Sequence, residues 1–221
     1  MERESSLRER LKIQTMTAHD KIEQNPILSQ LISPDLSLVN YVKILKRYLG
    51  FFRPLELSLS QEASLMQLIP DFYDRRRTQA LVADLHALGV SESEILGIPD
   101  CADVPELAPS FLEIMPISES CLRQARFLGI NYVLEGSTLG GSMMAKRLSV
   151  HPFLSEACLN FLSGHREQTG AFWQRFIRVL GDVDERNRTT LPQVEFVQWQ
   201  SAATMAAEET FSKMDLWMEQ A

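Results

Sequence analysis

Several features that mark particular classes of protein are absent from this sequence. Its three cysteines, Cys101, Cys121 and Cys158, have no CxxC spacing, so neither a disulfide framework nor a zinc site is expected. No apolar run approaches the ~18 residues that a membrane-spanning helix needs. The net charge is −7 and no long basic run occurs, which argues against nucleic acid as a partner. The N-terminal run MERESSLRERLK lacks the apolar stretch of a secretory signal, so we expect a cytoplasmic protein without a membrane attachment.

The short motifs of several common enzyme classes are also missing. The four histidines are His19, His86, His151 and His165. None belongs to an HExxH or a Glu-x-x-His motif, so neither a zinc protease nor a ferritin-like di-iron bundle is indicated. Neither a GxSxG elbow nor a Walker loop occurs.

Helical periodicity dominates what the sequence does contain. The chain has 221 residues, 45% of them hydrophobic, which suits a substantial core. No segment reads as a run of strands, so we predict a single all-α domain over residues 1–221. The expected helices span about residues 5–24, 36–53, 73–88, 118–148, 153–162, 167–180 and 192–218, with a short one after the capping box at residues 91–94.

Proline and glycine mark several of these boundaries. Pro54 is expected to kink the second helix or to end its first half. Gly89 lies in the C-cap position of the next helix, and Pro192 is a good first residue for the last one. Residues 99–116 are rich in proline, so we expect a connection there with a helical turn or two.

Three glycines lie close together within one predicted helix, in the run Gly136-Ser137-Thr138-Leu139-Gly140-Gly141. A glycine in a helix costs up to ~1 kcal/mol relative to alanine, so three cost roughly 2–3 kcal/mol. Gly136 and Gly140 are spaced i, i+4 and share one face. Close packing against another helix, or a bend without a ligand, would explain them. The alternative is a flat, bulky ligand pressed against this face.

The last predicted helix carries an apolar stripe at i+3 and i+4 spacing. Its members are Phe196, Trp199, Ala203, Ala206, Thr210, Phe211, Met214 and Trp217. Such a stripe is typical of a buried core face. Trp173 and Phe176, one turn apart on an earlier helix, are interpreted as core in the same way.

His19 is the most promising ligand among the histidines because of its neighbours. Lys12, Thr15, His19 and Glu23 are spaced by three and four residues and line one side of the first helix. Glu23 can accept a hydrogen bond from the ring nitrogen that does not face a ligand, which would fix the tautomer and raise the basicity of the other nitrogen. Lys12 can reach an anionic group at the edge of a pocket.

These residues resemble those of a known family. The run from Leu11 to Glu23 is similar to the proximal helix of haem oxygenases, with its Leu-Lys-x-x-Thr-x-x-x-His-x-x-x-Glu pattern. The run from Tyr132 to Gly141 resembles the bacterial form of the distal helix, Glu-Gly-Ser-x-Leu-Gly-Gly. Further similarity occurs at Thr169-Gly170-x-x-Trp173-x-x-Phe176 and at Ala207-x-x-Thr210-Phe211 with Trp217. The residues of these motifs most resemble those of the haem oxygenases associated with bacteriophytochromes.

The resemblance implies a site and a reaction. Haem b would be both substrate and cofactor and would lie between the two helices, with His19 as the proximal ligand of iron. Gly136, Ser137 and Gly140 would form the catalytic distal surface. Haem would also contact Lys12, Thr15, Glu23, Gly141 and Arg178. Dioxygen and electrons, from a donor such as a ferredoxin or a flavin reductase, would convert haem into biliverdin, carbon monoxide and ferrous iron. A bacteriophytochrome is a candidate biliverdin acceptor.

Two departures from the family pattern leave questions open. Ser137 stands where many members have an aspartate that organises the water network for proton delivery. Of the basic residues that hold the haem propionates, Lys12 matches by position, whereas Arg175 and Arg178 are candidates only. Two other functions therefore remain as alternatives, namely a haem-binding carrier without turnover and a thiaminase-like helical enzyme. The second is weakened because no cysteine lies beside an acid–base pair in the sequence.

Overall fold

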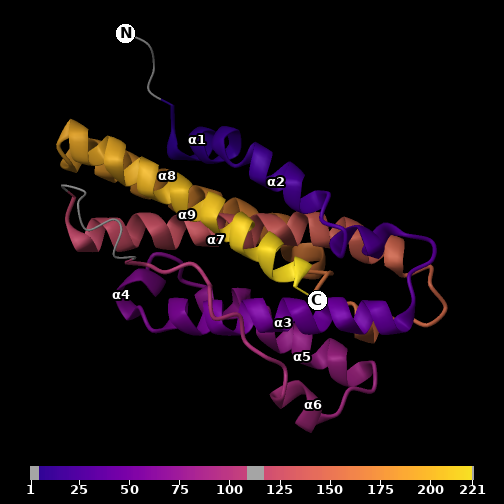
Figure 1. The fold of residues 1–221 in the computed structure, drawn as a ribbon. Helices are drawn as coiled ribbons and strands as arrows, with labels where there is room; N and C mark the ends of the chain where they lie inside the picture. Colours follow the sequence, from indigo (N-terminus) through magenta and orange to yellow (C-terminus); the bar gives the residue numbers. More distant parts are fainter. Residues whose placement is uncertain (1–4, 109–116, 221) are drawn as a thin grey trace.

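The computed structural model describes residues 5–108 and 117–220, and all regular structure in this part of the chain is helical. The long helices are α3 (Leu38–Ser60), α7 (Glu119–Leu148), α8 (Thr169–Thr190) and α9 (Gln193–Glu219) (Figure 1). The shorter α-helices are α1 (Leu7–Gln14), α2 (Met16–Glu23), α4 (Ala63–Met66), α5 (Thr78–Ala87) and α6 (Glu92–Leu96). Short 3-10 helices are η1 (Leu28–Ile32), η2 (Phe72–Arg75), η4 (Glu156–Cys158) and η5 (Arg166–Gln168).

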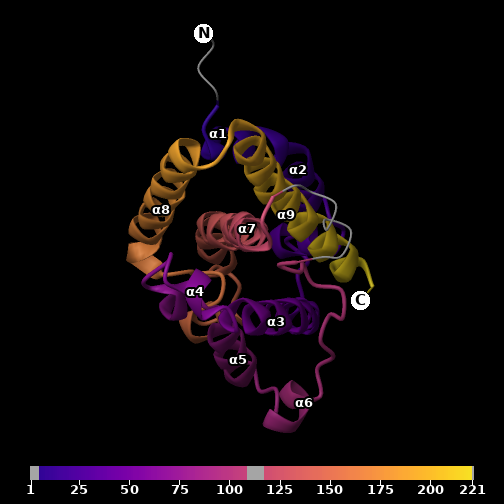
Figure 2. The same ribbon diagram turned by 90° about the vertical axis from the view of Figure 1, so that its left-hand side faces the viewer.

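Helix α7 occupies the middle of the molecule. Viewed along its length, it has α8 and α9 on either side, α1 above and α3 below (Figure 2). It packs most extensively on α9 and also on α8, and α1 and α2 pack on α9 as well. The backbone of Gly129 allows the closest approach, because a Cβ there would collide with the Ala203 carbonyl of α9. Helix α9 therefore supports both α2 and α7.

The predicted N-terminal helix is divided at Thr15. Helix α1 ends at Gln14 and α2 begins at Met16, although the Thr15 N–H still donates to the Leu11 carbonyl at 3.0 Å. The Thr15 hydroxyl donates to the same carbonyl at 2.7 Å. Threonine side chains bonded back in this way tend to bend helices. The helix that carries His19 is therefore separate from the one that carries Lys12.

Helix α3 continues through Pro54 to Ser60, so the interpretation in which Pro54 ends the helix is wrong. Proline has no N–H and leaves the carbonyl four residues earlier without its helical partner. That carbonyl belongs to Gly50, and it accepts instead from the Cys101 N–H at 2.8 Å. The connection that begins near Pro99 thus satisfies the group that proline orphans. No helix is assigned over residues 99–108, and residues 109–116 lie outside the described part.

The start of α5 differs from the prediction for residues 73–88. Tyr73 lies in η2, and α5 begins only at Thr78. The buried Glu56 carboxylate accepts from the backbone N–H groups of Arg77 and Thr78 at 2.6 and 3.1 Å, so a side chain of α3 caps this helix. At the other end Leu88 is the C-cap rather than Gly89, and Gly89 follows it with a φ of +82°, the left-handed conformation that glycine favours just beyond a helix.

The segments around α8 also differ from the prediction. Residues 153–162 contain only the 3-10 turn η4, because the Asp84 carboxylate takes the backbone N–H groups of Asn160 and Phe161 at 2.9 and 2.8 Å. Helix α8 runs ten residues beyond the predicted end at Leu180, to Thr190. A side chain at Gly181 would meet nothing within 4 Å, and the buried Val183 continues the apolar face.

Other predictions are confirmed within a residue. Helix α7 begins after the N-cap Ser118 and continues without interruption through Gly136, Gly140 and Gly141. The predicted capping box opens α6, and Pro192 is the N-cap of α9 rather than its first residue. Every member of the α9 stripe is buried, as is Phe176, whereas Trp173 is only partly buried against the core. Among the described helices, none combines the length and the apolar character that crossing a membrane requires.

Candidate functional site

The His19 side chain lies on α2 with 53% of its surface exposed. Its ring forms a T-shaped contact with Phe211 of α9, with centroids 5.7 Å apart and planes at 80°. Nδ1 lies 3.7 Å from the Glu23 carboxylate and 3.9 Å from that of Asp20. In the described part of the chain, these three side chains form the one group of acidic, histidine or cysteine residues with three donor atoms within 4.8 Å.

The position of Glu23 agrees with the predicted arrangement, but its contact is loose. A separation of 3.7 Å exceeds the length of a hydrogen bond. Both Glu23 and Asp20 are exposed, so their pull on the imidazole is screened by solvent. Both carboxylates lie on the Nδ1 side of the ring. Asp20 is a residue that sequence reasoning missed, because it lies beside His19 rather than one turn away.

Lys12 and Thr15, the other two residues of the predicted proximal face, differ in exposure and in hydrogen bonding. Lys12 is exposed and makes no ion pair with any residue that the structure describes. Thr15 is buried, and its hydroxyl is engaged with the Leu11 carbonyl. Lys12 therefore has a free charge to offer a ligand, whereas Thr15 shapes the helix.

The three glycines of the run on α7, namely Gly136, Gly140 and Gly141, have different surroundings, so the two interpretations of this run apply to different residues. A Cβ on Gly141 would lie 2.8 Å from the Leu162 carbonyl oxygen, which is a close backbone packing contact. A Cβ on Gly140 would meet nothing within 4 Å outside its own helix. On Gly136 it would meet only the Trp173 ring, at 3.8 Å. Gly140 thus faces open space, and Trp173 borders that space at Gly136.

Hydroxyl groups on this stretch of α7 are turned back to the helix itself. Ser137 donates to the Leu134 carbonyl at 2.6 Å, and Thr138 donates to that of Glu135 at 2.7 Å. The glycine-bearing stretch therefore offers backbone and engaged hydroxyls, and Ser137 supplies no ionisable group in place of an aspartate.

Aromatic side chains of α7 and α8 meet beside Gly136, and exposed cations lie on α1 and α8. The Tyr132 ring is 5.6 Å from that of Trp173. Burial raises the pKa of Tyr132, and the neighbouring Arg8 acts in the opposite direction. Arg8 is exposed and one turn before Lys12, a spacing from which sequence reasoning could have identified it. Arg178 is exposed on α8 and has no ion pair among the described residues.

Arg175 is committed elsewhere. Its guanidinium lies 2.9 Å from the Asp71 carboxylate, which also binds Arg75 at 2.6 Å. These hydrogen-bonded cations lower the pKa of Asp71 against the opposing effect of its burial. Of the two arginines that the sequence left as candidates, Arg178 is therefore the one whose charge is free.

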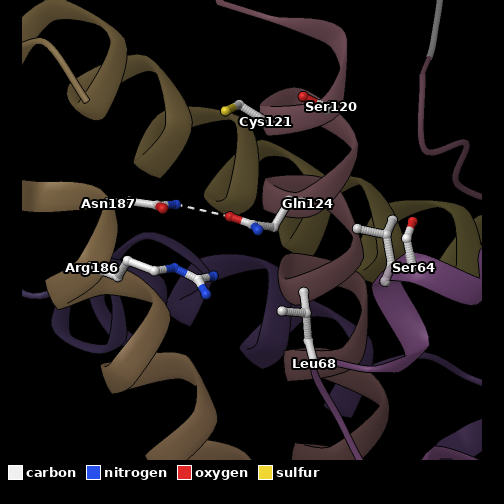
Figure 3. A pocket seen from close by; sticks show the side chains of 8 residues that line it. Ser64, Leu68, Ser120, Cys121, Gln124, Arg186 and Asn187 are labelled. Carbon is white, nitrogen blue, oxygen red and sulfur yellow. Dashed lines mark hydrogen bonds between the residues drawn. The ribbon is translucent and has the colours of Figure 1, made fainter. Parts of the chain in front are cut away.

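A cavity of about 380 Å³ lies elsewhere, at the N-terminal end of α7. It is lined by Ser64, Leu65, Leu68, Ser120, Cys121, Gln124, Arg186 and Asn187 (Figure 3). Asn187 donates to Gln124 across it at 2.8 Å, and the Arg186 side chain extends toward α7. A second cavity, of about 280 Å³, is lined by residues of α3, α5 and the segment 152–158. Neither includes His19 or a residue of the glycine run.

Comparison with known proteins finds a family whose sequence model matches most of this chain and solved structures with a similar fold. The model of the family described as "Heme oxygenase" matches residues 5–195. The structure of haem oxygenase from Leptospira interrogans aligns with a TM-score of 0.72 and 15% identity, covering 98% of this chain and 100% of that one. The NO- and CO-bound haem oxygenase from Neisseria meningitidis aligns with a TM-score of 0.66 and 23% identity, covering 97% and 91%. At these identities the two structures support the fold. No curated protein matches the chain.

Proposed function

This chain belongs to the haem oxygenase family, and on that premise we propose that His19 is the proximal ligand of haem iron, with haem lying between α2 and the glycine face of α7. The protein is an enzyme that binds haem as its substrate and degrades it with dioxygen. We further propose that the products are biliverdin, carbon monoxide and ferrous iron. The alternatives of a haem carrier and a thiaminase-like enzyme are not favoured by the family match.

Two observations together support the proposed site. The His19 side chain is half-exposed, and the face of α7 at Gly140 has open space beside it. An exposed imidazole with carboxylates on its Nδ1 side leaves Nε2 for a metal, and a carboxylate near Nδ1 increases the donor strength of the other nitrogen. The space above Gly140 admits a flat group against the backbone of α7. Both α2 and α7 pack on α9, which fixes their separation. The residues present therefore fit haem.

Haem, when bound, supplies the redox chemistry by which dioxygen is activated. The chain orients it and controls what reaches it. Gly140 allows the backbone of α7 to approach the ring and to shield part of its edge, and Trp173 limits that approach at Gly136. Because the Ser137 hydroxyl is engaged with the Leu134 carbonyl, this stretch offers no side-chain acid of the kind that promotes O–O cleavage in peroxidases. We therefore propose that protons arrive through water rather than from Ser137.

Free cations support a binding mode for the haem propionates. Lys12 and Arg178 are exposed and unpaired among the described residues, and Arg8 lies one turn before Lys12. We propose that these three side chains hold the propionates. Arg175 is left out because Asp71 binds it.

The reaction consumes electrons, so a reductant is required. We propose a donor such as a ferredoxin or a flavin reductase on this ground, and a cytoplasmic location, where such donors operate. The similarity of Glu-Gly-Ser-x-Leu-Gly-Gly to bacteriophytochrome-associated members is the support for a bacteriophytochrome as biliverdin acceptor.

Visible spectroscopy separates the three functions. The purified protein is titrated with haem, and a reductant is then added in air. We expect a Soret band of bound haem that decays to a bilin spectrum. A Soret band that persists would indicate a carrier, and the absence of any bound-haem spectrum would indicate an unrelated ligand.

A further inference from the structure

Arg75 is a buried cation that joins three elements next to the proposed site. Only 4% of its side chain is exposed, and the same is true of its partner Glu135 on α7. Nη1 donates to the Glu135 carboxylate at 2.5 Å, and Nη2 donates to the Phe172 carbonyl of α8 at 3.2 Å. The remaining bonds go to Asp71, at 2.6 and 3.1 Å. The guanidinium therefore links η2, α7 and α8.

The partners of Arg75 on α7 and α8 lie next in sequence to Gly136 and Trp173, the two residues that face each other at the edge of the site. Glu135 precedes Gly136, and Phe172 precedes Trp173. The Trp173 ring lies 3.8 Å from where a Gly136 Cβ would be, whereas Gly140 has nothing within 4 Å. Trp173 is therefore the boundary at which the open face of α7 ends, and Arg75 fixes the spacing of the two helices beside that boundary.

The surroundings of Phe172 strengthen this link. The His165 ring stacks on the Phe172 ring, with centroids 3.8 Å apart and planes at 10°, and the Arg75 guanidinium lies 5.0 Å from the Phe172 ring centroid. Packing on these groups leaves α8 little freedom to shift along α7 at this point. Because packed interfaces rearrange between discrete states rather than deform continuously, loss of one tie would move Trp173 measurably.

We propose that Arg75, acting through Glu135 and the Phe172 carbonyl, is a positioning residue that holds Trp173 against Gly136 and so determines which meso carbon of haem is attacked. This rests on the proposed haem site. A haem ring on α7 can extend toward Gly136 only as far as Trp173. The position of that ring edge decides which meso carbon is left unshielded by the α7 backbone. A small displacement of Trp173 then changes which edge of the ring is exposed.

The test is the proportion of biliverdin isomers formed by Glu135→Gln, separated chromatographically. This variant keeps the size of the side chain and an acceptor oxygen but removes the charge that Arg75 binds. The matched control is Glu209→Gln, because Glu209 on α9 pairs with Arg126, a fully buried arginine earlier on α7. We expect the minor isomers to rise several-fold in Glu135→Gln and to stay at the wild-type proportion in Glu209→Gln. Trp173→Phe, which trims the boundary directly, should change the proportions in the same way.

Unchanged proportions in Glu135→Gln, with or without a lower apo melting temperature, would overturn the inference and leave the ion pair a purely structural role. If Glu135→Gln does not fold, Trp173→Phe decides: wild-type isomer proportions in that folded variant overturn it equally. A change in Glu209→Gln as large as that in Glu135→Gln would show a general effect of loosening α7, which also contradicts it. If the wild type forms no bilin at all, the proposed function fails first and the inference falls with it.

Discussion

His19 differs from the other three histidines in what surrounds its ring. His86 lies 2.9 Å from the Glu92 carboxylate, His151 is near the Phe153 ring and His165 is stacked on Phe172. His19 forms a T-shaped contact with Phe211, has carboxylates near Nδ1 and remains 53% exposed. Of the four, it is the histidine whose second nitrogen is best placed for a metal.

The role of Glu23 can be separated from that of Asp20. If Glu23 polarises His19 once haem is bound, Glu23→Gln should keep haem but weaken the iron–histidine bond, because a neutral amide accepts a weaker hydrogen bond than a carboxylate. Resonance Raman spectroscopy should then show a lower iron–histidine stretching frequency. Asp20→Asn is the control, since Asp20 is slightly farther from Nδ1. A frequency unaffected by Glu23→Gln, or lowered equally by both changes, would remove the special role of Glu23.

The free cations make a second prediction at this scale. Lys12→Gln and Arg178→Gln should each weaken haem binding by up to about fivefold, because an exposed ion pair contributes about 1 kcal/mol or less. The loss should shrink at high salt, which screens such pairs. Haem titrations at low and high salt measure it, with Lys43→Gln on α3 as the control. A wild-type affinity in both variants would show that other groups hold the propionates.

At the scale of the element, α7 presents adjacent glycines to different surroundings. Gly140→Ala should keep or slightly raise the apo melting temperature, since alanine favours the helix by up to ~1 kcal/mol and its Cβ enters open space. Gly141→Ala should lower it, because the Cβ would lie 2.8 Å from the Leu162 carbonyl oxygen. Thermal melts of the two apo variants check this contrast.

For haem binding and bilin yield, in contrast to apo stability, a larger side chain should be more harmful at Gly140 than at Gly141. Gly140→Leu should retain a cooperative apo melt yet weaken haem binding or lower the bilin yield, because the leucine fills the space proposed for the ring. Gly141→Ala should keep the wild-type bilin yield per folded molecule. A destabilised Gly140→Leu apo protein with a normal yield would assign Gly140 to helix packing.

The features of the fold that the sequence predicted correctly depend largely on the spacing of residues close together in the chain. The α7 boundaries, the α6 capping box and the α9 core face follow from residues within a turn or two of one another, and all three are confirmed. The errors come from groups distant in sequence. Glu56 caps α5, Asp84 takes the backbone of residues 160 and 161, and Cys101 satisfies the carbonyl that Pro54 orphans. None of these contacts leaves a periodic signal.

The candidate site likewise combines residues that local spacing could predict with contacts between distant segments that it could not. The proximal set around His19 lies on one short stretch of chain, so its i, i+4 spacing was visible, while the break at Thr15 depends on a hydroxyl bond that spacing does not show. The link from Arg75 to Glu135 and Phe172 joins three distant segments. Trp173, interpreted as core, proved to border the open face of α7.

At the scale of the whole molecule, a buried charged layer lies between the η2–α5 region and the helices α7 and α8. Burial raises the pKa of Glu135 to about 7 against the opposing effect of Arg75. Burial, with Arg77 and Arg75 nearby, lowers the pKa of His165 from its ordinary 6.5 to about 4. The Nε2 atom of His165 is buried without a hydrogen-bond partner among the described residues.

Within this layer His165 contributes a pH dependence of apo stability that is opposite in sign to that of Glu135, because the raised pKa of Glu135 favours proton binding by the folded chain. Between pH values of about 6.5 and 4 the unfolded chain binds a proton at His165 that the folded chain does not, so this histidine destabilises the fold as pH falls. His165→Phe keeps a ring on Phe172 and removes the titration. Its apo melting temperature should therefore fall less than that of the wild type between about pH 7 and pH 5. Parallel pH profiles of the two proteins would show that His165 does not titrate in this way.

Single-turnover product analysis shows whether the intact protein cleaves haem while His19 holds the iron. Wild type, His19→Ala and His19→Ala with added imidazole are each loaded with stoichiometric haem and reduced in air, and biliverdin and carbon monoxide are quantified. We expect conversion of haem to both products by the wild type, a strong loss in His19→Ala and partial recovery with imidazole. Equal yields from wild type and His19→Ala, or a wild-type haem complex that stays intact, would contradict this expectation.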